Sequence, residues 1–272
     1  MADSVVASAP AKINVGLSVF PRRADGYHDI EGVFTTVSLH DTLSVSIADG
    51  EGECLVECPS MLLPAQNTFT AAYKAFCVLT GIGSSVRVTV DKRIPSGGGL
   101  GGGSSDAASF IQSIDSLFRT HLVASQLYEL ALSVGSDVPF FMHALCEAGE
   151  GKPYAAYVTG RGEKVEALQP RNLDVRLALP GVPVSTKEAY AWLDESIGRG
   201  EVRHNAFRGK KAWEAEWGKD PVDWRFVNDF TIPVSSRHEA IAAAIRDMRG
   251  AGASFADMSG SGSTVFGIFC GH

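Results

Sequence analysis

A run of glycines, within PSGGGLGGGSSDAASF at residues 95–110, constrains the fold of this chain more than any other feature. Six of the seven positions from Gly97 to Gly103 are glycine, the residue that loses the most conformational freedom on folding. So much glycine is expected where a ligand or a second backbone segment must approach the main chain closely. Ser104, Ser105 and Asp106 then supply helix-capping residue types, and apolar residues at helical spacing follow them. The run predicts a tight loop that leads directly into an amphipathic helix.

A loop of this kind is suited to binding a phosphate group. Backbone N–H groups that no Cβ atom shields can surround an anion, and the start of a helix adds a favourable dipole. A flexible linker is the alternative, but linkers do not run straight into a strongly periodic helix. The P-loop pattern G-x-x-x-x-G-K-[ST] is not matched, because no lysine follows the glycines. Gly97, Gly99 and Gly102 match G-x-G-x-x-G, but the acidic residue expected about 20 positions later is missing.

Composition narrows the class of protein and of partner. The 272 residues are 45% hydrophobic and 20% charged, which is typical of one large folded domain or two moderate ones. A net charge of −7, with scattered basic residues, argues against nucleic acid or an anionic membrane as the main partner. The start of the chain has no leader-like pattern, and no apolar run reaches membrane-spanning length. We expect a soluble, cytoplasmic protein; the oligomeric state stays open.

The five cysteines lack the spacing of a metal site. Cys54 and Cys58 form a lone C-x₃-C without histidine or cysteine partners nearby. We therefore expect reduced thiols and no metal-ligating side-chain cluster.

Apolar periodicity predicts a mixture of strands and helices. Strict βαβ alternation is missing, which favours an α+β fold over a doubly wound sheet. The glycine-rich loop at residues 146–163 is the expected seam between a first domain, 1–150, and a second, 151–272. Strands are expected at 11–20, 42–48, 86–90, 175–180 and 263–269, and helices at 67–79, 123–134, 184–193 and 237–248.

Three motifs resemble those of the GHMP kinases, named for galacto-, homoserine, mevalonate and phosphomevalonate kinases. KRIPSGGGLGGGSSDAA at 92–108 resembles their ATP loop, APAKINVGL at 9–17 their first motif, and MSGSGSTVFGIF at 258–269 their third. The resemblance implies a two-lobed α+β fold with its active site in the cleft between the lobes. ATP is the implied co-substrate, with Mg²⁺ carried on the phosphates.

The same resemblance assigns residues to the nucleotide. Asn67 resembles a residue near the adenine pocket, but capping of the following helix explains it equally well. Ser104 or Ser105 is expected to reach the Mg²⁺. The residues assigned to ATP are Asn67, Pro95, Ser96, Gly97, Gly98, Gly99, Leu100, Gly101, Gly102, Gly103, Ser104 and Ser105.

Further stretches resemble one subgroup of the family. They are RRADGYHDIEGVF at 22–34, GSDVPFF at 135–141 and PGVPVST at 180–186. The subgroup uses ATP to phosphorylate the 2-hydroxyl of a methylerythritol carried on cytidine diphosphate, in the non-mevalonate route to isoprenoids. The alternatives are a homoserine- or mevalonate-type kinase and a relative that binds ligand without catalysis. Residues 195–225, with three tryptophans, follow no family pattern.

Phosphoryl transfer depends on positioning and charge stabilisation rather than on covalent chemistry by the protein. Asp137 is the implied carboxylate that orients the hydroxyl or accepts its proton. Local sequence alone, with Asp137 before a Val-Pro pair, favours a helix N-cap instead, and both roles could hold together. Lys12 is the implied cation. It shares one strand face with Asn14, an implied substrate contact, although an exposed strand face has the same alternation.

Two residues after the Asp25-Gly26 turn are assigned to the cytidine group. The resemblance has Tyr27 stacking on the base and His28 bonding to its edge, whereas the plain alternative is a turn followed by a solvated histidine. These residues separate the subgroup from homoserine and mevalonate kinases, whose substrates have no base. Asn228 and Asp229, in FVNDF, match a family pattern whose role the sequence does not reveal.

Overall fold

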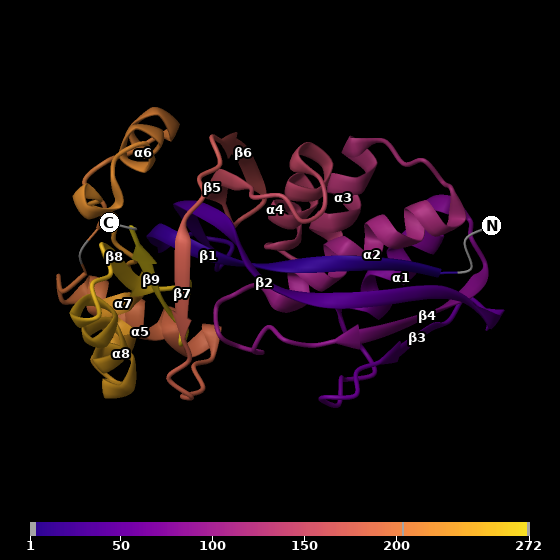
Figure 1. Cartoon of the computed structure of the whole chain (residues 1–272), viewed down its shortest axis with the longest axis horizontal. Helices are drawn as coiled ribbons and strands as arrows, with labels where there is room; N and C mark the ends of the chain where they lie inside the picture. The colour runs from indigo at the N-terminus through magenta and orange to yellow at the C-terminus, as the bar shows by residue number, and fades with distance from the viewer. Residues whose placement is uncertain (1–3, 203, 271–272) are drawn as a thin grey trace. The chain divides into compact units, whose positions relative to one another are not determined.

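A computed structural model of the chain describes residues 4–202 and 204–270 (Figure 1). They form two compact units. The first contains residues 4–11, Ser38–Pro95 and Gly101–Lys152, and the second contains Lys12–Val37, Ser96–Leu100 and the residues from Pro153 onward. The domain boundary near residue 150 stays a prediction, because these units are discontinuous along the chain.

The first unit combines antiparallel strands with a group of helices. Strands β1 (Ser4–Arg22) and β2 (His28–Glu51) begin in one unit and end in the other. Within the first unit β2 pairs antiparallel with β4 (Ser84–Asp91), and β3 (Cys54–Glu57) lies parallel to β4. Leu43 and Val45 of β2 lie opposite Val90 and Val88 and are fully buried, as the period of two predicts.

Helices of the first unit gather on one side of these strands, as Figure 1 shows. They contribute aromatic side chains to the core, where Phe69 and Phe110 meet edge to face with ring centroids 5.4 Å apart. The helical segments are α1 (Thr68–Thr80), α2 (Gly102–Phe118), α3 (Ala124–Val134), α4 (Val138–His143) and the π-helical turn Ala144–Ala148.

The second unit contains two groups of antiparallel strands. The first half of β2 pairs with β5 (Ala155–Gly160), which in turn pairs with β6 (Lys164–Leu168). A separate three-stranded sheet has the order β7-β9-β8, from Asp174–Ala178, Val265–Phe269 and Phe255–Met258. Its helices are α5 (Thr186–Gly198), α6 (Lys210–Trp217), α7 (Thr231–Ser235) and α8 (Glu239–Gly250), with a 3₁₀ turn at Pro221–Asp223. These mixed elements confirm the α+β class.

The three tryptophans of the segment without a family pattern, residues 195–225, pack together in the second unit. Trp213 and Trp217 of α6 are almost completely buried, and the rings of Trp217 and Trp224 stack with centroids 5.3 Å apart. The guanidinium of Arg171 lies over both stacked rings and donates to the carbonyls of Trp217 and Lys219. These tryptophans therefore belong to the aromatic core of the second unit.

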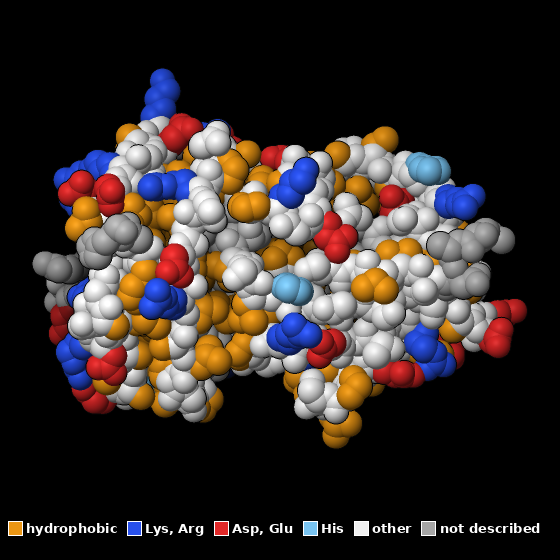
Figure 2. All heavy atoms as spheres, viewed as in Figure 1, with side chains coloured by type: hydrophobic (Ala, Val, Ile, Leu, Met, Phe, Trp, Pro, Cys, Tyr) orange, Lys and Arg blue, Asp and Glu red, His pale blue; other side chains and the backbone are white. Residues whose placement is uncertain are grey.

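The surface drawn in Figure 2 mixes acidic and basic side chains without a broad area of one sign. In the described ranges, no helix combines the length and the apolar character that crossing a bilayer requires.

Candidate functional site

The glycine loop adopts backbone conformations that other residues rarely take. Gly97 and Gly99 have φ angles of +73° and +77°, in the left-handed region that favours glycine. A Cβ atom on Gly99 would lie 2.1 Å from the carbonyl oxygen of Ser259. Position 99 therefore requires glycine for two reasons: its backbone conformation is left-handed, and a second glycine-containing loop approaches it closely.

Helix α2 begins earlier than the sequence predicts. Its N-cap is Gly101, with φ +70°, and the amides of Ser104 and Ser105 donate to the Gly101 carbonyl at 3.1 and 2.9 Å. Capping by Ser104, Ser105 or Asp106 is therefore wrong, since all three lie inside the helix. Because Gly101 has no side chain to cap the helix, the first-turn amides are suited to an external anion.

Lys12, predicted as the catalytic cation, is buried rather than exposed. Its side chain is 4% exposed, and Nζ donates to Asn14 Oδ1 at 2.6 Å and to the Gly99 carbonyl at 3.0 Å. The ring centroid of Phe34 lies 5.1 Å from Nζ. An exposed strand face is thereby excluded for Lys12 and Asn14, and the two side chains meet beside the glycine loop.

Ser259, in the third motif, completes this group and was missed by sequence reasoning. Its hydroxyl donates to the Gly99 carbonyl at 3.0 Å and accepts from the backbone N–H of Asn14 at 3.3 Å. The amide of Thr264 also donates to the Gly98 carbonyl at 3.2 Å. The only signal in the sequence was the third motif as a whole. The second unit therefore brings together three segments that lie far apart in the chain, which we call the Lys12 cluster: Lys12–Asn14, Gly98–Leu100 and Met258–Thr264.

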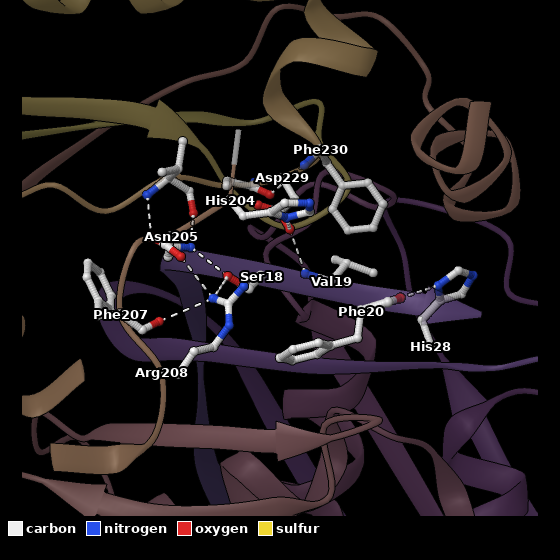
Figure 3. A network of polar contacts seen from close by, with 12 residues as sticks. Ser18, Val19, Phe20, His28, His204, Asn205, Phe207, Arg208, Asp229 and Phe230 are labelled. Carbon is white, nitrogen blue, oxygen red and sulfur yellow. Dashed lines mark hydrogen bonds and ion pairs between the residues drawn. The ribbon is translucent and has the colours of Figure 1, made fainter. Parts of the chain in front are cut away.

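The two predicted cytidine contacts differ in exposure. Tyr27 is 55% exposed, with the Arg161 guanidinium 4.8 Å from its ring centroid. His28 is buried, and its Nδ1 lies 2.8 Å from the carbonyl oxygen of Phe20 (Figure 3). The solvated-histidine alternative is therefore wrong, because tertiary contacts hold the imidazole.

Two other residues border His28 and were not predicted. The ring of Tyr190, on α5, lies 4.9 Å from the imidazole, and Asp194 Oδ1 lies 3.6 Å from Nε2. One face of His28 therefore lies against an aromatic ring, and its outer nitrogen lies near a carboxylate.

Asp137 is the N-cap residue of α4 by position, but its side chain makes no capping hydrogen bond. The alternative role, capping of α4, therefore lacks the side-chain hydrogen bond that defines an N-cap. Asp137 belongs to the first unit. Its catalytic role stays a prediction.

Asn67, in contrast, caps a helix as its local sequence allows. Its Oδ1 accepts from the amides of Phe69 and Thr70 at 3.0 and 3.2 Å, and its side-chain amide donates to Pro64. The capping alternative is confirmed, and contact with adenine stays a prediction.

A buried ion-pair group supports the start of α2 and had no signal in the sequence. Lys92 Nζ lies 2.5 Å from Asp41 Oδ2 and 2.7 Å from Asp106 Oδ2. Burial raises the pKa of Asp106 to about 7, against the opposing effect of the Lys92 ammonium. The neighbouring Asp41 carboxylate adds to this rise, because the two carboxylates share one ammonium. This group anchors the first turns of α2 to the end of β4.

Metal-binding clusters of three or more His, Cys, Asp or Glu side chains are absent from residues 4–202 and 204–270. The cysteines in these ranges are free thiols.

Comparison with known proteins identifies the family. Residues 67–144 match the GHMP kinases N terminal domain. The 4-diphosphocytidyl-2-C-methyl-D-erythritol kinase of Treponema pallidum (strain Nichols) is 43% identical, over 98% of this chain and 90% of that protein. The protein of the same name from Thermotoga maritima is 37% identical, over 95% of this chain and 90% of its own length.

Solved structures agree with this assignment. A crystal structure of 4-(cytidine 5'-diphospho)-2C-methyl-D-erythritol kinase superposes with a TM-score of 0.70 at 29% identity, covering 97% of this chain and 90% of that one. Homoserine kinase from Cytophaga hutchinsonii, at 18% identity and a TM-score of 0.64, covers 98% of this chain and 85% of its own, and shares the fold. The three motifs, the α+β fold and relatives above 30% identity over nearly the whole chain agree: the chain belongs to the 4-diphosphocytidyl-2-C-methyl-D-erythritol kinases, a branch of the GHMP kinases.

Proposed function

We propose that this protein transfers the γ-phosphoryl group of ATP to the 2-hydroxyl of 4-diphosphocytidyl-2-C-methyl-D-erythritol, in the non-mevalonate route to isoprenoids. The single observation that carries the proposal is the buried ammonium of Lys12, held by Asn14 and by the Gly99 carbonyl. These two contacts orient the ammonium beside the glycine loop. A cation so placed is suited to stabilising the negative charge that develops during phosphoryl transfer.

The glycine loop supplies the nucleotide contacts in this proposal. Amides between Gly97 and Ser105 bind the phosphates of ATP, helped by the uncapped start of α2. Asn67 and Pro95 are the proposed neighbours of the rest of the nucleotide. Substitution of residues in this loop is therefore expected to act mainly on ATP.

Magnesium is proposed to travel with the phosphates. The hydroxyl of Ser105 is buried without a hydrogen-bond partner in the described residues. One such hydroxyl suits a cation that keeps most of its ligands as phosphate oxygens and water. Ser105, or Ser104 one position earlier, would hold the ion. When bound, Mg²⁺ neutralises charge on the transferring phosphoryl group.

Asp137 is the proposed partner of the accepting hydroxyl. Its carboxylate orients the 2-hydroxyl and accepts its proton as the oxygen bonds to the γ-phosphorus and the bond to the bridging oxygen of ADP breaks. Tyr27 stacks on the cytosine ring, His28 bonds to the base edge, and Asn14 contacts the substrate beside Lys12. Tyr27 has the exposed ring that such stacking needs.

An acceptor panel tests the proposal. ADP release is followed with ATP and either 4-diphosphocytidyl-2-C-methyl-D-erythritol, homoserine or mevalonate, and phosphorus NMR locates the new phosphate. We expect turnover with the cytidine compound alone and a phosphate on its 2-hydroxyl. Faster turnover of homoserine or mevalonate would assign another GHMP activity. Binding of the cytidine compound without ADP release would assign a ligand-binding relative.

A further inference from the structure

Asn228, just before α7, holds the third glycine-containing loop by its side chain. The side-chain amide donates to the carbonyls of Met258 and Gly260 at 2.7 and 2.8 Å. The same side chain accepts from the amide of Phe230 at 3.0 Å, and the residue is 1% exposed. Because the two carbonyls stand on either side of Ser259, one amide group fixes the backbone that carries this hydroxyl.

Ser259 connects that support to the Lys12 cluster. Its hydroxyl bonds to Gly99 and Asn14, which are the two residues that orient the Lys12 ammonium. A shift of the loop at Ser259 would therefore displace both acceptors of Lys12 together. The hydrogen bonds of the Asn228 side chain go to this loop and to Phe230, so Asn228 acts through the loop.

Asp229, the next residue, holds a different segment. Its Oδ2 accepts from the Val19 amide and from His204 Nδ1, each at 2.8 Å, and the residue is 2% exposed (Figure 3). The carbonyl of Phe20, one residue beyond Val19, lies 2.8 Å from Nδ1 of His28. Asp229 therefore fixes the part of β1 whose carbonyl orients the imidazole.

We propose that Asn228 and Asp229 are positioning residues with separate roles in the reaction. Asn228 sets the geometry of phosphoryl transfer through Ser259 and the Lys12 cluster. Asp229 sets the recognition of the cytidine group through Val19, Phe20 and His28. The inference rests on the proposed function. A purely structural role for this buried dipeptide would instead impair both steps alike.

Steady-state kinetics separates the two possibilities. Asn228→Asp keeps the side-chain shape and removes both donors, so kcat falls about 100-fold, as expected for a misplaced catalytic group. Its KM for the cytidine substrate changes by less than about threefold, because Asn14 is the one proposed substrate contact that moves with Ser259. Asp229→Ala removes the acceptor for Val19, so this KM rises about tenfold while kcat stays within about threefold. Asp229→Asn retains an oxygen for the Val19 amide and restores most of the affinity.

Controls exclude loss of folding as the cause. Glu216→Gln changes another buried carboxylate of the second unit, bound to Lys219 and Arg225, and leaves both kinetic constants unchanged. Thermal unfolding checks every variant. If Asn228→Asp does not fold, Asn228→Ser replaces it, because serine keeps one donor and adds no charge.

Calorimetric titration with cytidine diphosphate supplies a measurement without turnover. Asp229→Ala weakens this binding about tenfold, and the Asn228 variants leave it unchanged. Equal changes of kcat and KM in the Asn228 and Asp229 variants would overturn the inference. A wild-type protein that binds cytidine diphosphate but transfers no phosphate would overturn the proposed function alone, and the titration would then decide for or against the role of Asp229. A wild type that does not bind it overturns both.

Discussion

Replacing Gly99 with alanine tests the contact on which the Lys12 cluster depends. The new Cβ atom would lie 2.1 Å from the Ser259 carbonyl oxygen, whereas real Cβ contacts do not fall below 3.0 Å. The two loops must therefore part by about 1 Å. Such a displacement moves an acceptor of Lys12, and misplacement of about 1 Å costs about 100-fold in rate.

The expected loss of stability has two parts. Alanine at φ +77° costs about 1–2 kcal/mol, because its Cβ atom crowds the backbone in the left-handed region. Separation of the loops also breaks the 3.0 Å bond between Ser259 and the Gly99 carbonyl, a further loss of about 1 kcal/mol. We therefore expect the free energy of unfolding to fall by roughly 2–3 kcal/mol.

Gly200→Ala is the matched control for backbone strain. Gly200 also has a left-handed φ, +69°, but nothing lies within 4 Å of the Cβ position. Denaturant unfolding and kcat at saturating ATP and acceptor are measured for both variants. In Gly200→Ala the free energy of unfolding should fall by only about 1–2 kcal/mol, the cost of alanine in the left-handed region, and kcat should stay unchanged. If Gly99→Ala matches Gly200→Ala in both stability and kcat, the close approach of the loops does not position Lys12.

Four further outcomes are expected. Lys12→Ala lowers kcat more than it weakens ATP binding, and unchanged turnover at saturating substrates would contradict its role. Asp137→Asn slows turnover by about 10²–10⁴-fold with an unchanged unfolding transition, and a rate near the wild-type value would remove the carboxylate from the mechanism. Tyr27→Ala raises the KM for the cytidine substrate and not for ATP, so equal changes in both would exclude stacking. Burial raises the pKa of Asp106 to about 7, so the folded state holds this proton over a range in which the unfolded state has lost it. Relative to Asp106→Asn, the unfolding free energy of the wild type should therefore fall as pH rises from about 4 to 7, by up to about 1.4 kcal/mol per pH unit, and a pH-independent difference would refute the shift.

Local sequence patterns predict the structure correctly where it depends on one short segment of the chain. Alternation around Leu43 and Val45 predicts a half-buried strand, because a period of two puts both side chains on one face. Asn67 caps α1 through amides two and three residues away, within reach of local sequence. The start of α2 was predicted too late, because the left-handed conformation of Gly101 allows the helix to begin at once.

The sequence by itself determined the family, the α+β class and the motifs that supply the candidate site, because residue spacing and backbone propensity are local properties. Only the tertiary structure decided that Lys12 is buried against Gly99, 87 residues away, and that Ser259 joins them from the far end of the chain. The same holds for the buried imidazole of His28 and for the pairing of Lys92 with Asp41 and Asp106. Such contacts depend on how the strands and loops are arranged in space, and a polar side chain looks the same in sequence whether the fold leaves it in water or places it beside a partner.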